Sequence, residues 1–375
     1  MIRKLFCLSA VLTITFGQSY FNMRGLGEIN PPADARIMSL GSPAALSYLN
    51  PGILVHLDKT CFNGTALAIG TIGSETGQNR FIGNIRPAGF HSAVPLPLNS
   101  RLVMGIDQRF NQDFDVWSEL LSDTAYRYHI VGRGGIHALR AGIAHSMFKT
   151  GCIGIEYNRL VGSSREDWRF ETLEGAYVSI DTIELTYSGN ALKIGASVQA
   201  ELFSIAGFYE PSVRLNAKSS RRVHGVVKDS IKDYKIKLPN LFALGATVNP
   251  FEKLVLVAGL EYRPWSDITV NNTASESNRD AIRFCFGSAC PVGPVQLRLG
   301  YSYQPWYYTA AGNEPITDHR LHLGTSIPIP KFGSLDIAAE LSRRDGGYLS
   351  ETSGYLTLTL AYHEAWLKRT RHWGY

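Results

Sequence analysis

The chain has 375 residues, of which 45% are hydrophobic, 18% are charged and 36 are glycine. Its 37 Lys and Arg residues are scattered among 32 Asp and Glu residues, which gives no basic patch of the kind that binds nucleic acid. No region has the polar, highly charged composition of a disordered chain. The length therefore leaves two soluble domains or one large barrel.

Residues 1–19 have the pattern of a secretory signal peptide. Arg3 and Lys4 precede an apolar run over 5–16, and a small-residue cleavage site follows at 17–19. The run is shorter than the ~20 residues of a membrane-spanning helix, although an N-terminal anchor is the alternative. No later segment reaches ~18 uncharged apolar residues, so we expect no helical span in the mature protein.

Residues 20–60 differ in texture from everything that follows. Prolines and glycines at 31–32, 41–43 and 50–52 interrupt this segment, and a short helix over 44–49 would end before Pro51. The segment is too apolar for a linker and too broken for a strand. We expect a plug folded into a barrel mouth, with a loose periplasmic tail as the alternative.

Apolar and polar residues alternate through most of the region 61–366. In 295–304, Leu297 and Leu299 share one face and Arg298 lies on the other, and this period of two is that of a β-strand. Runs of about ten residues fit a tilted membrane-spanning strand. We predict fourteen strands, over residues 61–71, 81–94, 100–110, 135–147, 151–160, 178–188, 191–203, 240–249, 253–263, 279–288, 294–304, 319–328, 334–343 and 354–364.

The gaps between these strands alternate in length. Tight turns are expected at 149–150, 188–190, 250–252, 289–293 and 329–333. Longer gaps fall at 111–134, 161–177, 204–239, 264–278, 305–318 and 344–353. Within 204–239, residues 211–215 and 223–236 are candidates for extra strands. An even strand count with short turns at one end is typical of bacterial outer-membrane barrels. The fold class is therefore an all-β transmembrane antiparallel barrel over 61–366, with a C-terminal tail at 367–375.

Charged residues fall consistently on one face of the predicted strands. The opposite face carries residues such as Leu192, Ile194 and Val198, which would meet lipid, where a charge at mid-depth costs about 2–4 kcal/mol. These charges form a network in the lumen or, in the simpler alternative, a solvated wall. The lumen-facing candidates are Arg140, Glu156, Lys193, Glu201, Glu261, Arg263, Arg298, Asp336 and Glu340.

Aromatic residues gather near the strand ends, where amphipathic rings are expected at the level of the lipid headgroups. They are Tyr157, Tyr187, Tyr262, Trp265, Trp306, Tyr307, Tyr308, Tyr362 and Trp366.

Apart from Cys7 in the signal, four cysteines remain, at 61, 152, 285 and 290. Cys285 and Cys290 flank a predicted turn and either pair or stay as thiols. The spacing fits no zinc site, and no motif for phosphate, dinucleotide or hydrolase chemistry is present. We therefore expect no metal, no cofactor and no enzyme.

Asn50-Pro51-Gly52, after the small residues of 40–45, resembles the Asn-Pro-Ala/Gly hatch motif of the FadL-type long-chain fatty-acid transporters. The segments 239–245 and 261–267 resemble paired strands of that family and of its PorV-like relatives, as do 297–303 and 333–338. The resemblance extends over nearly the whole mature chain. It implies a fourteen-stranded barrel closed by an N-terminal hatch at 20–60, which passes hydrophobic molecules.

The first functional hypothesis is passive transport of hydrophobic, fatty-acid-like small molecules across the bacterial outer membrane, gated by the hatch, with outer-membrane lipids around the barrel. The alternative is a PorV-like secretion or assembly partner that binds another protein through its outer loops. A barrel without cargo is a third reading. The charged residues of the longest connection that would present such a docking surface are Lys218, Arg221, Arg222, Lys228, Asp229, Lys232 and Asp233.

Overall fold

The computed structural model describes residues 18–32, 34–53, 59–75, 78–120, 126–147, 150–172, 177–223, 226–227, 232–251, 253–274, 277–309, 314–347 and 349–364. The predicted signal up to residue 17, the predicted tail, Trp366, Lys228 and Asp229 lie outside this part of the chain. Within it, no helix combines the length and hydropathy needed to cross a membrane.

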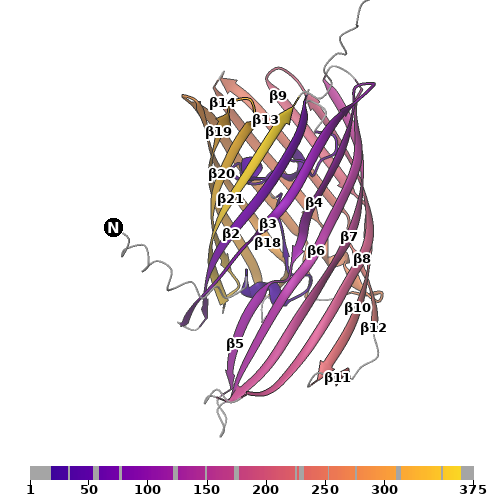
Figure 1. Ribbon diagram of the computed structural model, residues 1–375, viewed down its shortest axis with the longest axis vertical. Helices are drawn as coiled ribbons and strands as arrows, with labels where there is room; N and C mark the ends of the chain where they lie inside the picture. Colours follow the sequence, from indigo (N-terminus) through magenta and orange to yellow (C-terminus); the bar gives the residue numbers. More distant parts are fainter. Residues whose placement is uncertain are drawn as a thin grey trace, which may run out of the picture.

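The described strands form one antiparallel sheet that closes into a fourteen-stranded barrel (Figure 1). The wall runs β2–β3–β4–β6–β7–β8–β9–β13–β14–β17–β18–β19–β20–β21, and β21 pairs with β2 to close it. The wall strands are β2 (Thr60–Glu75), β3 (Gln78–Leu96), β4 (Ser100–Asn111), β6 (Tyr126–Ser146), β7 (Gly151–Thr172), β8 (Tyr177–Gln199), β9 (Phe203–Glu210), β13 (Leu241–Phe251), β14 (Leu254–Arg263), β17 (Ala281–Val292), β18 (Val295–Thr309), β19 (Pro315–Ile329), β20 (Gly333–Asp345) and β21 (Leu349–Glu364).

Further strands lengthen one side of the wall, which reaches farther down than the rest in Figure 1. They are β5 (Phe114–Leu120), β10 (Val213–Val223), β11 (Val226–Val227), β12 (Lys232–Leu238), β15 (Thr269–Val270) and β16 (Thr273–Ala274). β5 continues β4 along β6, and β10 continues β9 along β8. Strands of 21 to 23 residues in β6, β7 and β8 exceed the ~10 residues that span a bilayer. This side, here called the raised side of the wall, therefore extends beyond the membrane.

The predicted alternation of faces is confirmed. Leu297 and Leu299 are 46% and 58% exposed on the outside, whereas Arg298 between them is 3% exposed. Leu192 and Ile194 flank buried Lys193 in the same way. Because aliphatic side chains cover the outer face of strand after strand, the wall is built to face lipid.

The predicted division of 178–203 into two strands is wrong, although the total of fourteen is right. β8 runs unbroken through 188–190, and the turn falls at 200–202. The missing strand is β9, which lies almost entirely in the predicted loop 204–239. In the same loop β10 overlaps the candidate strand 211–215, and β11 and β12 overlap the candidate 223–236. Gly189 is a strand residue because β10 packs closely against it, opposite Leu215.

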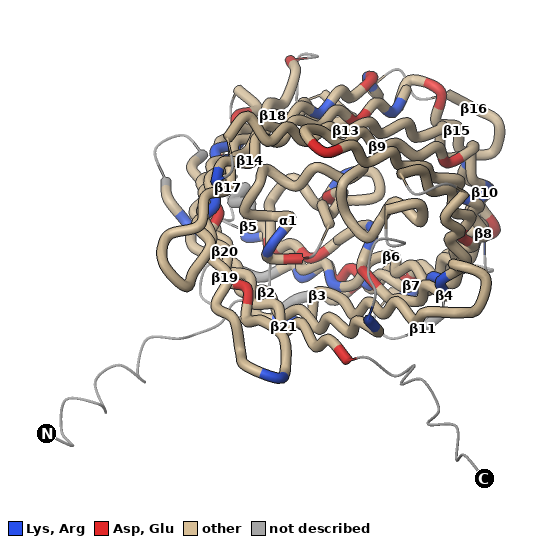
Figure 2. The backbone as a smooth tube through the Cα atoms, turned by 90° about the horizontal axis from the view of Figure 1, so that it is seen from above, with Lys and Arg blue, Asp and Glu red and all other residues tan. Residues whose placement is uncertain are grey.

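Residues 18–53, here called the lumen segment, lie inside the ring of strands (Figure 2). Their elements are short: the 3-10 helix η2 (Tyr20–Met23), β1 (Glu28–Ile29), α1 (Ala35–Met38) and the 3-10 helix η3 (Ala44–Leu46). Asp34 caps α1 by accepting a hydrogen bond from the Arg36 N–H. Proline, glycine and asparagine prevent longer helices.

Several aromatic residues expected at headgroup level are instead buried inside the barrel. Trp265, which opens the 3-10 helix η5 (Trp265–Asp267), is fully buried, and Trp306, Tyr307 and Tyr308 are 6%, 2% and 5% exposed. They form one apolar core with Tyr187, Phe110 and Phe21 of the lumen segment. Residues 306–308 were predicted to lie in the gap 305–318, but β18 continues to Thr309, with a register shift between Pro305 and Thr309.

All four cysteines outside the signal are free thiols. Cys285 is buried and Cys290 is exposed, and both lie within β17 rather than on either side of a turn. Of the two open possibilities for Cys285 and Cys290, the unpaired one is therefore correct.

Candidate transport site

The Asn50-Pro51-Gly52 motif fixes the lumen segment to the wall. Asn50 is fully buried, and its side-chain amide donates to the carbonyl oxygens of Ala45 (2.9 Å) and of Ala196 on β8 (3.2 Å), while its Oδ1 accepts from the Gly52 N–H (2.9 Å). Gly195 lies directly behind it, where a Cβ would overlap the Asn50 amide. One asparagine therefore shapes its own turn and binds the wall.

A second contact depends on wall glycines. Gly287, Gly300 and Gly324, on the neighbouring strands β17, β18 and β19, lie against the backbone and side chains of residues 39–41. A Cβ at any of the three would overlap that segment, and Gly41 itself has a φ of 85°, which favours glycine. The C-terminal half of the lumen segment therefore packs directly on the backbone of the wall, at positions where the wall has no side chains.

Three predicted lumen residues meet at the middle of the barrel. Glu156 is fully buried and accepts from Arg140 (2.5 Å), and the Lys193 ammonium lies 3.6 Å from it. Arg140 also donates to the backbone carbonyl of Tyr48 in the lumen segment (2.5 Å). The Tyr48 ring stacks on His91 of β3 with the ring centroids 3.3 Å apart.

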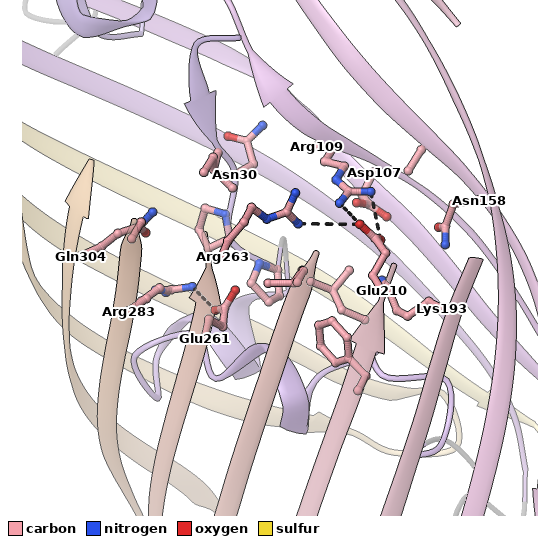
Figure 3. Close-up of a pocket in the computed structure, with 18 of the residues that line it drawn as sticks. Asn30, Asp107, Arg109, Asn158, Lys193, Glu210, Glu261, Arg263, Arg283 and Gln304 are labelled. Atoms are coloured by element: carbon pink, nitrogen blue, oxygen red, sulfur yellow. Dashed lines mark hydrogen bonds and ion pairs between the residues drawn. The ribbon is translucent and has the colours of Figure 1, made fainter. Parts of the chain in front are cut away.

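Beside this group is a chamber of about 80 Å³, here called the charged chamber (Figure 3). Arg109 and Arg263 both approach Glu210, and Arg283 pairs with Glu261 at 2.9 Å. Arg263 is buried, yet its Nη1 has no hydrogen-bond partner among the described residues. Apolar surface is supplied by Pro31, Pro32, Leu49, Phe208, Leu241 and Trp265.

Glu28 joins the lumen segment to a second group of charges that the sequence analysis did not single out. Its carboxylate is 2% exposed and accepts from Arg320 (2.9 Å), Arg344 (2.8 Å) and Gln18 (2.7 Å). Arg320 also binds the predicted lumen residue Glu340 at 2.9 Å. Arg320 shares the inward parity of β19, so the same period-two argument would have found it.

Arg344 extends this group to the beginning of the lumen segment. It donates to Ser19 (2.8 Å), Asp318 (2.9 Å) and Glu351 (2.9 Å), and Glu351 accepts from the Tyr20 N–H (2.5 Å). Burial, reinforced by Glu351, raises the pKa of the Tyr20 hydroxyl to about 12. Gln18 and Ser19 are therefore integral parts of the folded barrel, although the predicted signal peptide included both.

The remaining predicted lumen residues differ in position. Arg298 and Asp336 are buried 3.6 Å apart near the short-turn end of the barrel. Asp336 and, more strongly, burial raise the pKa of Asp34 in the lumen segment. Glu201 does not join these residues, because β8 ends at Gln199 and Glu201 is exposed in the turn that follows.

The wall has a notch between β3 and β4. β3 pairs with β4 only over 89–96, so that 78–88 has no strand partner on this side among the described residues. Pro87 lies in the unpaired part and has no N–H to donate to a ladder. At this level β4 pairs instead with β1, with Glu28 opposite Asn111.

The first part of the lumen segment fills the notch. Arg86 of β3 donates to the Gln18 side chain (3.0 Å), and the Tyr20 hydroxyl donates to the Arg80 carbonyl (3.2 Å). A smaller pocket of about 30 Å³ lies beside these contacts, lined in part by Pro31, Met38, Leu67 and Ala88. Gln18, Glu28 and Asn30 of the lumen segment therefore line this pocket together with Arg86 and Ala88 of β3.

Among the described residues, no group of three or more His, Cys, Asp and Glu side chains is placed to hold a metal ion. The arrangement offers charges, apolar surface and a folded lumen segment instead. A closed barrel with an aliphatic outer face and a folded segment in its lumen defines a plugged transmembrane β-barrel.

No family model and no curated protein sequence matches this chain. Solved structures do resemble it: the toluene transporter TbuX of Ralstonia pickettii (TM-score 0.61, 14% identity, 92% of this chain and 100% of that chain) and the toluene transporter TodX of Pseudomonas putida (0.60, 12%, 91% and 100%). A FadL homologue of Pseudomonas aeruginosa gives 0.59 at 12% identity, covering 93% and 98%. The predicted resemblance to the FadL-type transporters is thus confirmed for the fold.

Proposed function

We propose that this protein is an outer-membrane channel for hydrophobic small molecules and that the lumen segment is its gate. The observation that carries the proposal is the notch beside β3, which residues 18–30 of the lumen segment fill together with Asp113, whose carboxylate accepts from Asn84. Withdrawal of those residues would join the pocket behind them to the lipid at the side of the barrel. An apolar solute would then leave sideways without crossing the aqueous end of the barrel.

The two halves of the lumen segment have different attachments, which supports gating by the first half. Residues 39–52 rest on wall glycines and on the buried Asn50, so a displacement there would break many close contacts. Residues 18–30 place Phe21 and Leu26 in the aromatic core and pair β1 with β4. Their side chains also make many hydrogen bonds and ion pairs to polar groups of the wall. Such contacts can be exchanged for water as the segment moves.

The cargo suggested by the charged chamber is an apolar molecule with an acidic end, which agrees with a fatty-acid-like substrate. The unpartnered Nη1 of Arg263 offers a donor to a carboxylate, and Trp265 and Phe208 offer apolar surface. Toluene is the cargo named for TbuX and TodX. Uptake of a fatty acid and of toluene by the Arg263→Met variant separates the two classes, since only the acid should lose uptake.

A reversible disulfide between the lumen segment and the wall tests whether residues 18–30 form the gate. Ile29 and Phe110 are opposite each other in the β1–β4 pair, and the Asn30 N–H bond to the Arg109 carbonyl makes theirs the non-hydrogen-bonded pair. Such pairs have Cα atoms about 4.5 Å apart, within disulfide range. The variant is Ile29→Cys/Phe110→Cys.

The tether is introduced with Cys290→Ser, which removes the exposed native thiol. Uptake of a fluorescent fatty acid into liposomes should stop when the pair is oxidised and return on reduction. Ile29→Cys alone is the control and should not respond to oxidation. Equal uptake by the oxidised and reduced double variant would rule out gating by this half.

A further inference from the structure

The outer face of the raised side of the wall carries a row of cations that the transport site does not use. Arg159 on β7, Arg214 on β10 and Lys237 on β12 are all exposed. Arg214 is directly opposite Lys237, and it lies next to Asn190, one residue beyond the Leu215–Gly189 pair. Asn190 is in turn opposite Arg159. Four adjacent strands therefore place three cations and one amide in one row perpendicular to the strands.

These cations lack carboxylate partners. Among the described residues no ion pair joins Arg159, Arg214 or Lys237 to an acid, and the Arg159 guanidinium donates only to the Asn190 side-chain oxygen (2.8 Å). Like charges directly opposite on a sheet are destabilising, so the Arg214–Lys237 pair has a cost that an external anion would remove. Lys235, two residues from Lys237 on the same face, adds a further exposed cation opposite Asn216.

Cations farther from the membrane are different, because they have acids beside them. Arg221 pairs with Asp181 at 3.1 Å, and Arg222 is 3.8 Å from Glu184. Lys218 is directly opposite Asp233. A solvated face would be expected to mix charges at every level, but the row lacks this mixing. The absence of acids is therefore specific to one level of the wall.

The Arg159 end of this row lies at the edge of the lipid-facing band. One step toward the short-turn end, Tyr157 is opposite Leu192, and both are more than 40% exposed. The Tyr157 hydroxyl donates to Asn190 (2.7 Å), so its ring lies directly below the row. On the neighbouring strands, the rings of Tyr209 and Phe242 lie 4.7 Å apart on the outer face. Exposed aromatic rings mark the headgroup level of a bilayer.

We propose that this row binds the phosphate groups of lipids in the outer leaflet. The acyl chains of such a lipid would lie against Leu192 and Ile194, and the phosphates would reach Arg159, Arg214 and Lys237. Guanidinium groups bind phosphate through paired charge-assisted hydrogen bonds. Four strands about 4.8 Å apart spread the cations widely enough for a headgroup with two phosphates. Such a lipid would fix the raised side of the wall in the membrane.

The test is a titration of the purified barrel in neutral detergent, read by its thermal transition. The probes are a bisphosphorylated glycolipid, the same lipid without phosphates, and inorganic pyrophosphate. The variant is Arg214→Gln/Lys237→Gln, and the control Lys253→Gln/Lys331→Gln removes two exposed cations from the opposite end of the barrel. Each Lys or Arg near an anionic lipid surface strengthens binding about fivefold, so we expect about 25-fold weaker binding by the variant.

The proposal predicts that the bisphosphorylated lipid raises the transition temperature of the native protein and of the control, and that the lipid without phosphates does not. Equal stabilisation by both lipids would show that only acyl chains bind. Equal affinity of the variant and native protein would exclude this row. Stabilisation by pyrophosphate alone would identify an anion site without a lipid, and would also overturn the proposal.

Discussion

Replacement of Glu28 by glutamine should release the first half of the lumen segment while the barrel stays folded. The Glu28 carboxylate is 2% exposed and binds both Arg320 and Arg344. Loss of one member of a buried ion pair costs about 3–5 kcal/mol. The lower end applies here, because Asp318 still faces both arginines. About 3 kcal/mol corresponds to a roughly 150-fold increase in the population of the opened segment.

Hydrogen exchange followed by mass spectrometry measures this opening. Peptides from 18–32 should exchange about 100-fold faster in Glu28→Gln, and peptides from 39–53 should be unchanged, because wall glycines hold them. Glu340→Gln is the matched control, since Glu340 binds Arg320 on the wall side only. If both halves of the lumen segment exchange faster together, the division into a fixed half and a moving half is wrong.

Three further predictions concern the same segment. Gly195→Ala should destabilise residues 39–52 of the lumen segment by about 1–3 kcal/mol through overpacking. Gly64→Ala, with no atom within 4 Å of the new Cβ, should be neutral in the same exchange assay. Because burial and Asp336 raise the pKa of Asp34, protonation of Asp34 favours the folded lumen segment. The protection of this segment against hydrogen exchange should rise as pH falls through that pKa and level off below 3.8. Asp34→Asn should remove this pH dependence. Intact mass should show that the mature chain retains Gln18, because that residue is 1% exposed and hydrogen-bonded inside the barrel; a mature chain without it would contradict this.

The period of two predicted the faces of most wall strands correctly, and the reason is local. A residue such as Leu299 or Arg298 faces lipid or lumen according to its parity alone, once the strand is recognised. The same argument failed at 188–190, since serine, glycine and asparagine look like a turn there. What makes this stretch a strand is β10, which lies beside it and is close only in the folded barrel.

The candidate site was predictable in composition but not in arrangement. Arg140, Glu156 and Lys193 were expected in the lumen, yet their meeting depends on the register of β6, β7 and β8. The role of Glu28 could not be predicted from the sequence, because β1 has only two residues and so shows no alternation of polar and apolar positions. Its importance comes from Arg344, which is 316 positions away in the sequence.

The barrel with one apolar face follows from the amino-acid sequence, because side-chain alternation is a property of each strand alone. The sequence also marked Asn50 as a structural residue through its motif. The position of the lumen segment, the notch between β3 and β4 and the row of cations outside become visible only in the folded barrel. These features depend on register and closure, which bring together residues that no local pattern relates.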